Sequence, residues 1–143
     1  TNAQTPLFIS QYLHPYLKKS QGCIISILDI HANGKPFGGY TVYNMAKAAH
    51  QMMVQSLAIE LAPDIRVNGI APGINILPME GTEQALTAGT IEKICHAVPL
   101  KRIGTPQDIA QVAVFLAAAP YITGQIIAVD GGRGLTLAGN ESR

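Results

Sequence analysis

The sequence predicts an α/β fold built on a doubly wound parallel sheet, and three observations support this prediction. Short apolar runs alternate with longer segments of helical periodicity, which is the pattern of βαβ units. The chain can bury a sizeable core, because 48% of its 143 residues are hydrophobic and only 13% are charged. Polar residues, glycine or proline follow each apolar run, where parallel strands present their ligand-binding edge.

The first helix is expected at residues 6–17. Apolar side chains recur there with the i, i+3, i+4, i+7 spacing of an amphipathic helix, at Ile9, Tyr12, Leu13 and Tyr16. Lys18 and Lys19 fall in its last turn, where positive charge suits the helix dipole. Gln21 and Gly22 then end the helix.

A first strand is expected at residues 23–28, because a short apolar run without alternation is typical of a strand buried on both faces. Asp29 follows at the carboxyl end of this strand. Three glycines and a proline make residues 31–39 a loop. A long helix then covers residues 41–61 and is ended by Pro63.

A second strand is predicted at residues 65–71 and is stopped by Pro72-Gly73. Residues 81–96 are less regular and can be partly helical. The next helix has a clear start, since Thr105 is a good N-cap and a proline occupies the first helical position. A third strand is expected at residues 124–130.

Composition excludes several classes of function. The formal net charge is +1 and the charges are scattered, so neither nucleic acid nor a membrane surface is an expected partner. No apolar run reaches the ~18 residues needed to cross a bilayer. Cys23 and Cys95 form no CxxC pair, and the four histidines lack ligand spacing. We therefore expect no metal site and a reducing compartment, the cytoplasm.

The chemistry is expected where the strands end, because ligands bind there in open α/β sheets. Asp29, Pro72-Gly73 and the start of the helix with Tyr43 and Lys47 all collect at this edge. Tyr43 and Lys47 share a helix face, and a nearby ammonium group lowers the pKa of a phenol. Such a tyrosine can exchange a proton with C=O or C=N during hydride transfer. Asp29 can instead be a loop carboxylate that caps a turn.

Four motifs stand out: Asn2 before the first helix, Tyr43-Asn44-Met45-Ala46-Lys47, Arg66-Val67-Asn68-Gly69-Ile70-Ala71-Pro72-Gly73 and Tyr121-Ile122-Thr123-Gly124. Together with their positions relative to the predicted strands, these motifs resemble the short-chain dehydrogenase/reductase family and imply its Rossmann-like fold. The family tetrad of Asn, Ser, Tyr and Lys places Asn2, Tyr43 and Lys47, with Asp29 at the serine position. That aspartate and the residues around Tyr43 are similar to the pteridine reductases.

The resemblance implies an NADPH-dependent reductase of biopterin- or folate-type substrates, with NADH left open as the cofactor. Catalytic roles fall on Asp29, Tyr43, Lys47 and Asn2, where Lys47 also binds the nicotinamide ribose. The implied cofactor residues are Tyr43, Lys47, Pro72, Gly73, Ile74 and Asn75. The implied substrate residues are Asp29, Tyr43, Ile74 and Leu77. Asn75 can equally be a turn residue.

Two other functions stay open: a short-chain reductase of a keto or hydroxy substrate such as a 3-oxoacyl thioester or a sugar, and a non-catalytic oligomeric scaffold. The 143 residues contain no Gly-rich turn that opens a helix after a strand. We therefore expect residues 1–143 to be the C-terminal catalytic half of one domain. Its N-terminal cofactor-binding half would be its partner, on the same chain or as a separate chain. The family resemblance implies a homodimer or homotetramer built partly through the first two helices.

Overall fold

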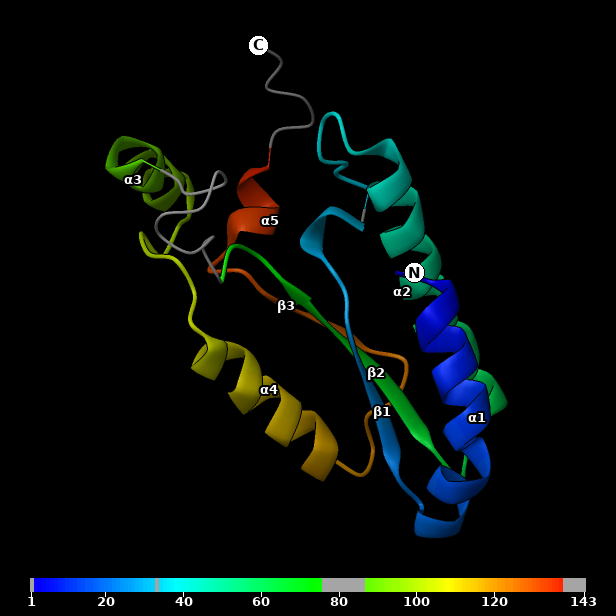
Figure 1. Ribbon diagram of the computed structural model, residues 1–143. Coiled ribbons are helices and arrows are strands. Elements are labelled where there is room, and N and C mark those ends of the chain that lie inside the picture. The colour runs from blue at the N-terminus through cyan, green and yellow to red at the C-terminus, as the bar shows by residue number, and fades with distance from the viewer. Residues whose placement is uncertain (1, 33, 76–86, 138–143) are drawn as a thin grey trace.

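The computed structural model describes residues 2–32, 34–75 and 87–137. Three parallel strands form one sheet in the order β1-β2-β3, with bounds β1 (Cys23–Ile27), β2 (Arg66–Pro72) and β3 (Ile126–Val129). Helices cover both faces, α1 (Gln4–Ser20) and α2 (Thr41–Glu60) on one side and α4 (Pro106–Ala118) on the other (Figure 1). The predicted parallel α/β fold is thereby confirmed.

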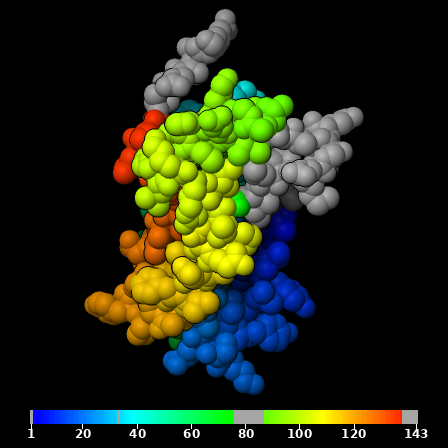
Figure 2. All heavy atoms as spheres, turned by 90° about the vertical axis from the view of Figure 1, so that its left-hand side faces the viewer, coloured from blue at the N-terminus to red at the C-terminus, as the bar shows by residue number. Residues whose placement is uncertain are grey.

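Three shorter helices lie toward the end of the molecule where the strands terminate. They are η1 (Ile30–Ala32), α3 (Ala88–Ala97) and α5 (Arg133–Thr136). Figure 2 looks onto the side covered by α3 and α4. No helix in the described ranges is both long and apolar enough to pass through a membrane.

The predicted ends of the elements agree with the structure to within a few residues. Gln21 adopts a left-handed conformation with φ 50°, and the amide of Gly22 donates to the carbonyl of Leu17, which ends α1 as expected. The expected N-cap of α4 is present as a capping box between Thr105 and Asp108. In the irregular region the structure shows α3, and residues 81–86 lie outside the described residues.

The amphipathic helix at the start of the chain is confirmed, and one burial prediction, that for the first strand, is wrong. The amphipathic stripe of α1 faces away from the sheet, with Tyr12 73% and Tyr16 64% exposed, while Ser10 is the one buried residue of the helix. The strand predicted to be buried on both faces is only partly covered. Within the described sheet β1 pairs along one edge, with β2, and Ile27 at its end is 49% exposed.

The core forms where α2 packs against the sheet. Its buried members are Leu28, Ile30, Val54, Leu57, Ala58, Ile65, Val67 and Ala71. Asn68 is fully buried in β2, and both ends of its amide are bonded: Nδ2 donates to the carbonyl of Ile122 at 2.8 Å, and Oδ1 accepts from the amide of Gln125 at 3.0 Å. These bonds fix the turn that leads into β3 and so set the position of the strand's end.

Candidate active site

The structure brings Asp29 and Tyr43 into direct contact. Asp29 follows β1 and Tyr43 lies in the first turn of α2, and the hydroxyl of Tyr43 donates to Oδ2 of Asp29 at 2.6 Å. The other carboxylate oxygen accepts the amide of His31 at 2.8 Å. Asp29 therefore both caps a turn and receives the phenol, because the turn fixes one oxygen and aims the other at Tyr43.

The environment of Tyr43 keeps its proton in place. Burial, the hydrogen bond to Asp29 and the charge of Asp29, in that order, raise the pKa of Tyr43 well above its usual value. The prediction that Lys47 lowers this pKa is wrong for this arrangement. The neutral phenol is favoured because its acceptor is an anion.

Lys47 contacts the backbone instead of the phenol hydroxyl. Its side chain is 9% exposed, and Nζ donates to the carbonyl oxygens of Ile27 at 3.2 Å and Leu28 at 3.3 Å. The ammonium lies 5.8 Å from the centre of the Tyr43 ring, within the range of a cation–π contact. Lys47 thus fixes the first turns of α2 against the end of β1.

Asp29 and Tyr43 open into a cleft of about 620 Å³. Pro72, Gly73 and Ile74, which the sequence predicts as cofactor residues, line the same cleft. Gly73 allows the ends of β2 and β3 to approach, because a Cβ there would lie 2.7 Å from Cβ of Asp130. Asp29, Tyr43 and Pro72-Gly73 therefore lie together at the carboxyl ends of β1 and β2.

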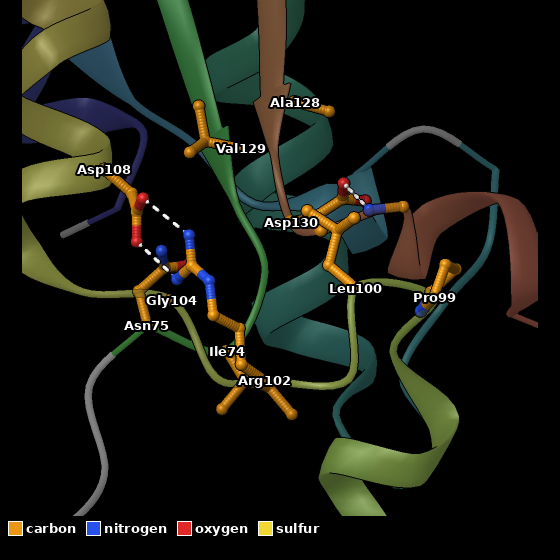
Figure 3. Close-up of a pocket in the computed structure, with 12 residues that line it drawn as sticks. Ile74, Asn75, Pro99, Leu100, Arg102, Gly104, Asp108, Ala128, Val129 and Asp130 are labelled. Carbon is orange, nitrogen blue, oxygen red and sulfur yellow. Dashed lines mark hydrogen bonds and ion pairs between the residues drawn. The ribbon is translucent and has the colours of Figure 1, made fainter.

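Asn75 and Asn2 are predicted site residues that do not line this cleft. Asn75 lines a second pocket of about 400 Å³ on the α4 side, where its amide packs closely against Gly104 (Figure 3). Asn2 is exposed, gives α1 no side-chain cap, and lies with its backbone beside His50. Leu77 lies outside the described residues.

The second pocket contains an ion pair in which the two charged groups bind each other directly. Arg102 donates to both carboxylate oxygens of Asp108, at 2.8 and 2.9 Å (Figure 3). Asp108 also accepts the amide of Thr105 at 2.7 Å, so Arg102 and Thr105 together hold its pKa well below the usual range. The charges of this pair are matched to each other, and the pair ties the loop before α4 to that helix.

His50 is a buried neutral group one helical turn beyond Lys47. Its side chain is 5% exposed, and neither ring nitrogen meets the criteria for a hydrogen bond among the described residues. Burial and then the positive charge of Lys47 lower the pKa of His50, opposed by the backbone of Asn2.

Sequence reasoning missed two cations of the cleft, Lys35 and Arg133. The sequence predicts no role for either residue, yet both are half-buried and line the cleft. Tyr40 also lines it and stacks on Phe37 with ring centres 4.7 Å apart. The sequence position of the two cations could have indicated their role, because both follow turns at the carboxyl ends of strands.

Comparison with known proteins finds similar chains. A family model described as enoyl-(acyl carrier protein) reductase matches residues 1–133. The chain is 38% identical over 143 residues to a tropinone reductase homolog of Arabidopsis thaliana, covering 97% of this chain and 54% of the relative. It is 35% identical over 148 residues to pteridine reductase 1 of Leishmania tarentolae, covering 96% and 50%.

The fold is also similar to solved structures. A 7α-hydroxysteroid dehydrogenase complexed with NADH and 7-oxo glycochenodeoxycholic acid matches with a TM-score of 0.81 and 35% identity, over 92% of this chain and 52% of that one. The chain spans about half the length of these relatives.

Proposed function

The chain belongs to the short-chain dehydrogenase/reductase family, and on that premise we propose that it reduces pterins with NADPH. The observation that carries the proposal is the 2.6 Å contact between Tyr43 and Asp29 at the mouth of the cleft. The relatives include a pteridine reductase, a tropinone reductase homolog and a hydroxysteroid dehydrogenase, so the family alone does not select a substrate.

The carboxylate favours a heterocycle over a ketone. An ionised carboxylate accepts hydrogen bonds and donates none, so Asp29 suits a ligand that presents N–H donors. A 2-amino-4-oxopteridine has several such donors, whereas a keto oxygen has none and would lie next to a negative charge. Asp29 therefore supports pterin binding and disfavours a simple ketone.

Tyr43 is the proposed proton donor. Its raised pKa keeps it protonated at neutral pH, and it lies within hydrogen-bond reach of the cleft. Tyr43 would donate to a ring nitrogen of the substrate while Asp29 orients the phenol and accepts an N–H of the heterocycle. Lys47 would hold α2, and hence Tyr43, in register with the end of β1.

The residues present fit a nicotinamide cofactor. The close approach at Gly73 leaves the ends of β2 and β3 in contact below the cleft, with Pro72 and Ile74 on its wall next to Tyr43. When bound there, the cofactor supplies the hydride. The choice of NADPH over NADH is part of the proposal, as is a reducing compartment such as the cytoplasm, which the free thiols of Cys23 and Cys95 support.

Two surfaces support proposed partners. The free edge of β1 can pair with further strands that carry a Gly-rich cofactor loop, because unpaired strand edges take up additional strands. The outward apolar face of α1 and α2 includes Tyr12, Tyr16, Val42 and Met45, which are 64–80% exposed, and it suits a second copy of the protein.

Substrate preference tests the proposal. The purified protein should oxidise NADPH with dihydrobiopterin or dihydrofolate and not with a ketosteroid or a 3-oxoacyl thioester. Asp29→Ser should lower kcat/KM for pterins strongly and leave any ketone activity nearly unchanged. Ketone reduction that exceeds pterin reduction in the wild-type protein would refute the pterin assignment. A wild-type protein without reductase activity, together with a Tyr43→Phe variant that leaves every cellular phenotype unchanged, would favour a scaffold.

A further inference from the structure

The cleft holds two cations that the proposed reaction does not use. Lys35 comes from the loop after η1, and Arg133 is the first residue of α5. Asp29 is the one carboxylate among the described residues that line the cleft, and it is already bonded to Tyr43 and to the amide of His31. The lining therefore has positive charge that its own acidic group does not match.

Both cations are held in place by backbone carbonyls. Nζ of Lys35 donates to the carbonyl of Gly134, and Nη1 of Arg133 donates to the carbonyl of Ala97 at 3.3 Å. Since Gly134 is the neighbour of Arg133 in α5, the first of these bonds brings the two charged side chains to the same turn. Neither forms an ion pair within the described ranges.

Among the described residues, most of their N–H donors have no partner. An ammonium group has three N–H donors and a guanidinium five, and the described contacts use one of each. Both half-buried cations line the same cleft and have no counter-ion among the described residues, so an anion bound in the cleft would be attracted to both. Carboxylates and phosphates match such a pair because each offers several acceptor oxygens.

We propose that Lys35 and Arg133 bind an anionic substituent of the substrate, a carboxylate or a phosphate ester, while Asp29 and Tyr43 hold its heterocycle. The inference rests on the proposed function and adds the substrate class: a pterin with a negatively charged side chain. The stacked rings of Phe37 and Tyr40 line the same cleft and provide an apolar surface for the spacer between heterocycle and anion.

Matched substrates test the inference. Lys35→Gln and Arg133→Gln should each lower kcat/KM about tenfold for dihydrofolate, mainly through KM, because a charged hydrogen bond is lost. Both variants should change kcat/KM for the uncharged dihydrobiopterin less than twofold. Dihydroneopterin monophosphate distinguishes phosphate from carboxylate, and Lys19→Gln, which removes an exposed cation of α1, is the control. Equal losses on charged and uncharged substrates, or no loss on either, would overturn the inference.

A binding measurement separates this inference from the proposed function. p-Aminobenzoylglutamate carries the carboxylates of folate without the heterocycle, and calorimetry should show weaker binding to both variants than to the wild-type protein. If the wild-type protein reduces no pterin but shows this pattern, the pterin assignment fails and the anion site stands. If it reduces pterins and the variants bind p-aminobenzoylglutamate as the wild type does, the anion site fails alone.

Discussion

The two pockets each contain a carboxylate that caps a backbone amide and meets a side-chain donor, yet their chemistry is opposite. Asp108 faces the guanidinium of Arg102, which stays charged at every accessible pH, so the pKa of Asp108 is lowered and the pair is closed. Asp29 faces the phenol of Tyr43, a neutral donor whose pKa it raises. The two carboxylates therefore differ in the donor they meet, which is a matched cation at Asp108 and a neutral phenol at Asp29.

The largest expected effect comes from removing the phenolic proton of Tyr43. Tyr43→Phe should lower kcat for pterin reduction about 10²- to 10⁴-fold, the usual contribution of general acid catalysis, with the fold intact. NADPH consumption measures the rate, and circular dichroism checks the fold. Tyr40→Phe, which removes another phenol of the cleft, should stay within about threefold of wild type. A Tyr43→Phe enzyme above a tenth of wild-type activity would show that another group donates the proton.

Asp29→Asn should lower the pKa of Tyr43. Two of the three causes that raise this pKa are the hydrogen bond to Asp29 and its charge, and the variant removes the charge. Phenolate absorbance, measured as the difference between each protein and its Tyr43→Phe counterpart, isolates Tyr43 from the other tyrosines. An unchanged or higher pKa in Asp29→Asn would show that the charge of Asp29 does not raise it.

The same shift gives a pH dependence of stability. Because the folded pKa of Tyr43 lies above the unfolded value of 10.0, its contribution is complete below pH 10 and is lost as the pH rises toward the folded pKa. Urea unfolding of the wild type should therefore weaken above pH 10 more than that of Tyr43→Phe. Parallel curves for the two proteins would contradict the raised pKa.

At the second pocket, a substitution should change the stability of the protein and not its activity. Thr105→Ala removes the N-cap of α4 and should cost about 1 kcal/mol of unfolding free energy, with kcat/KM unchanged. Chemical denaturation and the pterin assay measure the two quantities. A substantial fall in kcat/KM at unchanged stability would show that the second pocket takes part in the reaction.

The smallest effect is expected at His50. Its folded pKa is lowered below 6.5, so its contribution to stability is complete above pH 6.5 and is lost as the pH falls through the folded pKa. His50→Leu replaces the buried neutral imidazole by an apolar side chain that cannot be protonated. The fall in Tm below pH 6.5 should therefore be smaller in this variant. The same fall in both proteins would assign the acid sensitivity to other groups.

Much of the site could be predicted because local spacing encodes it. Tyr43 and Lys47 lie four residues apart on one helix, and parallel strands bring Asp29 and Gly73 to the same edge of the sheet. The contact between Asp29 and Tyr43 follows from that arrangement.

Other features depend on contacts that spacing does not encode. The sequence shows that Lys47 is near Tyr43 but not that its ammonium donates to the carbonyls of Ile27 and Leu28, and so it gave the wrong direction for the pKa of the phenol. Lys35 and Gly134 are 99 residues apart, and the path of the intervening chain decides their contact. The sequence shows the helical spacing of the apolar side chains of α1, but it does not show which way this apolar face points.

A crystal structure of the protein with NADP⁺ and a dihydropterin would test the central claim most directly. The claim predicts the heterocycle in the cleft, an N–H of its ring on Asp29, and a ring nitrogen within hydrogen-bond distance of the Tyr43 hydroxyl. A heterocycle bound elsewhere, or one that turns its N–H groups away from Asp29, would contradict it.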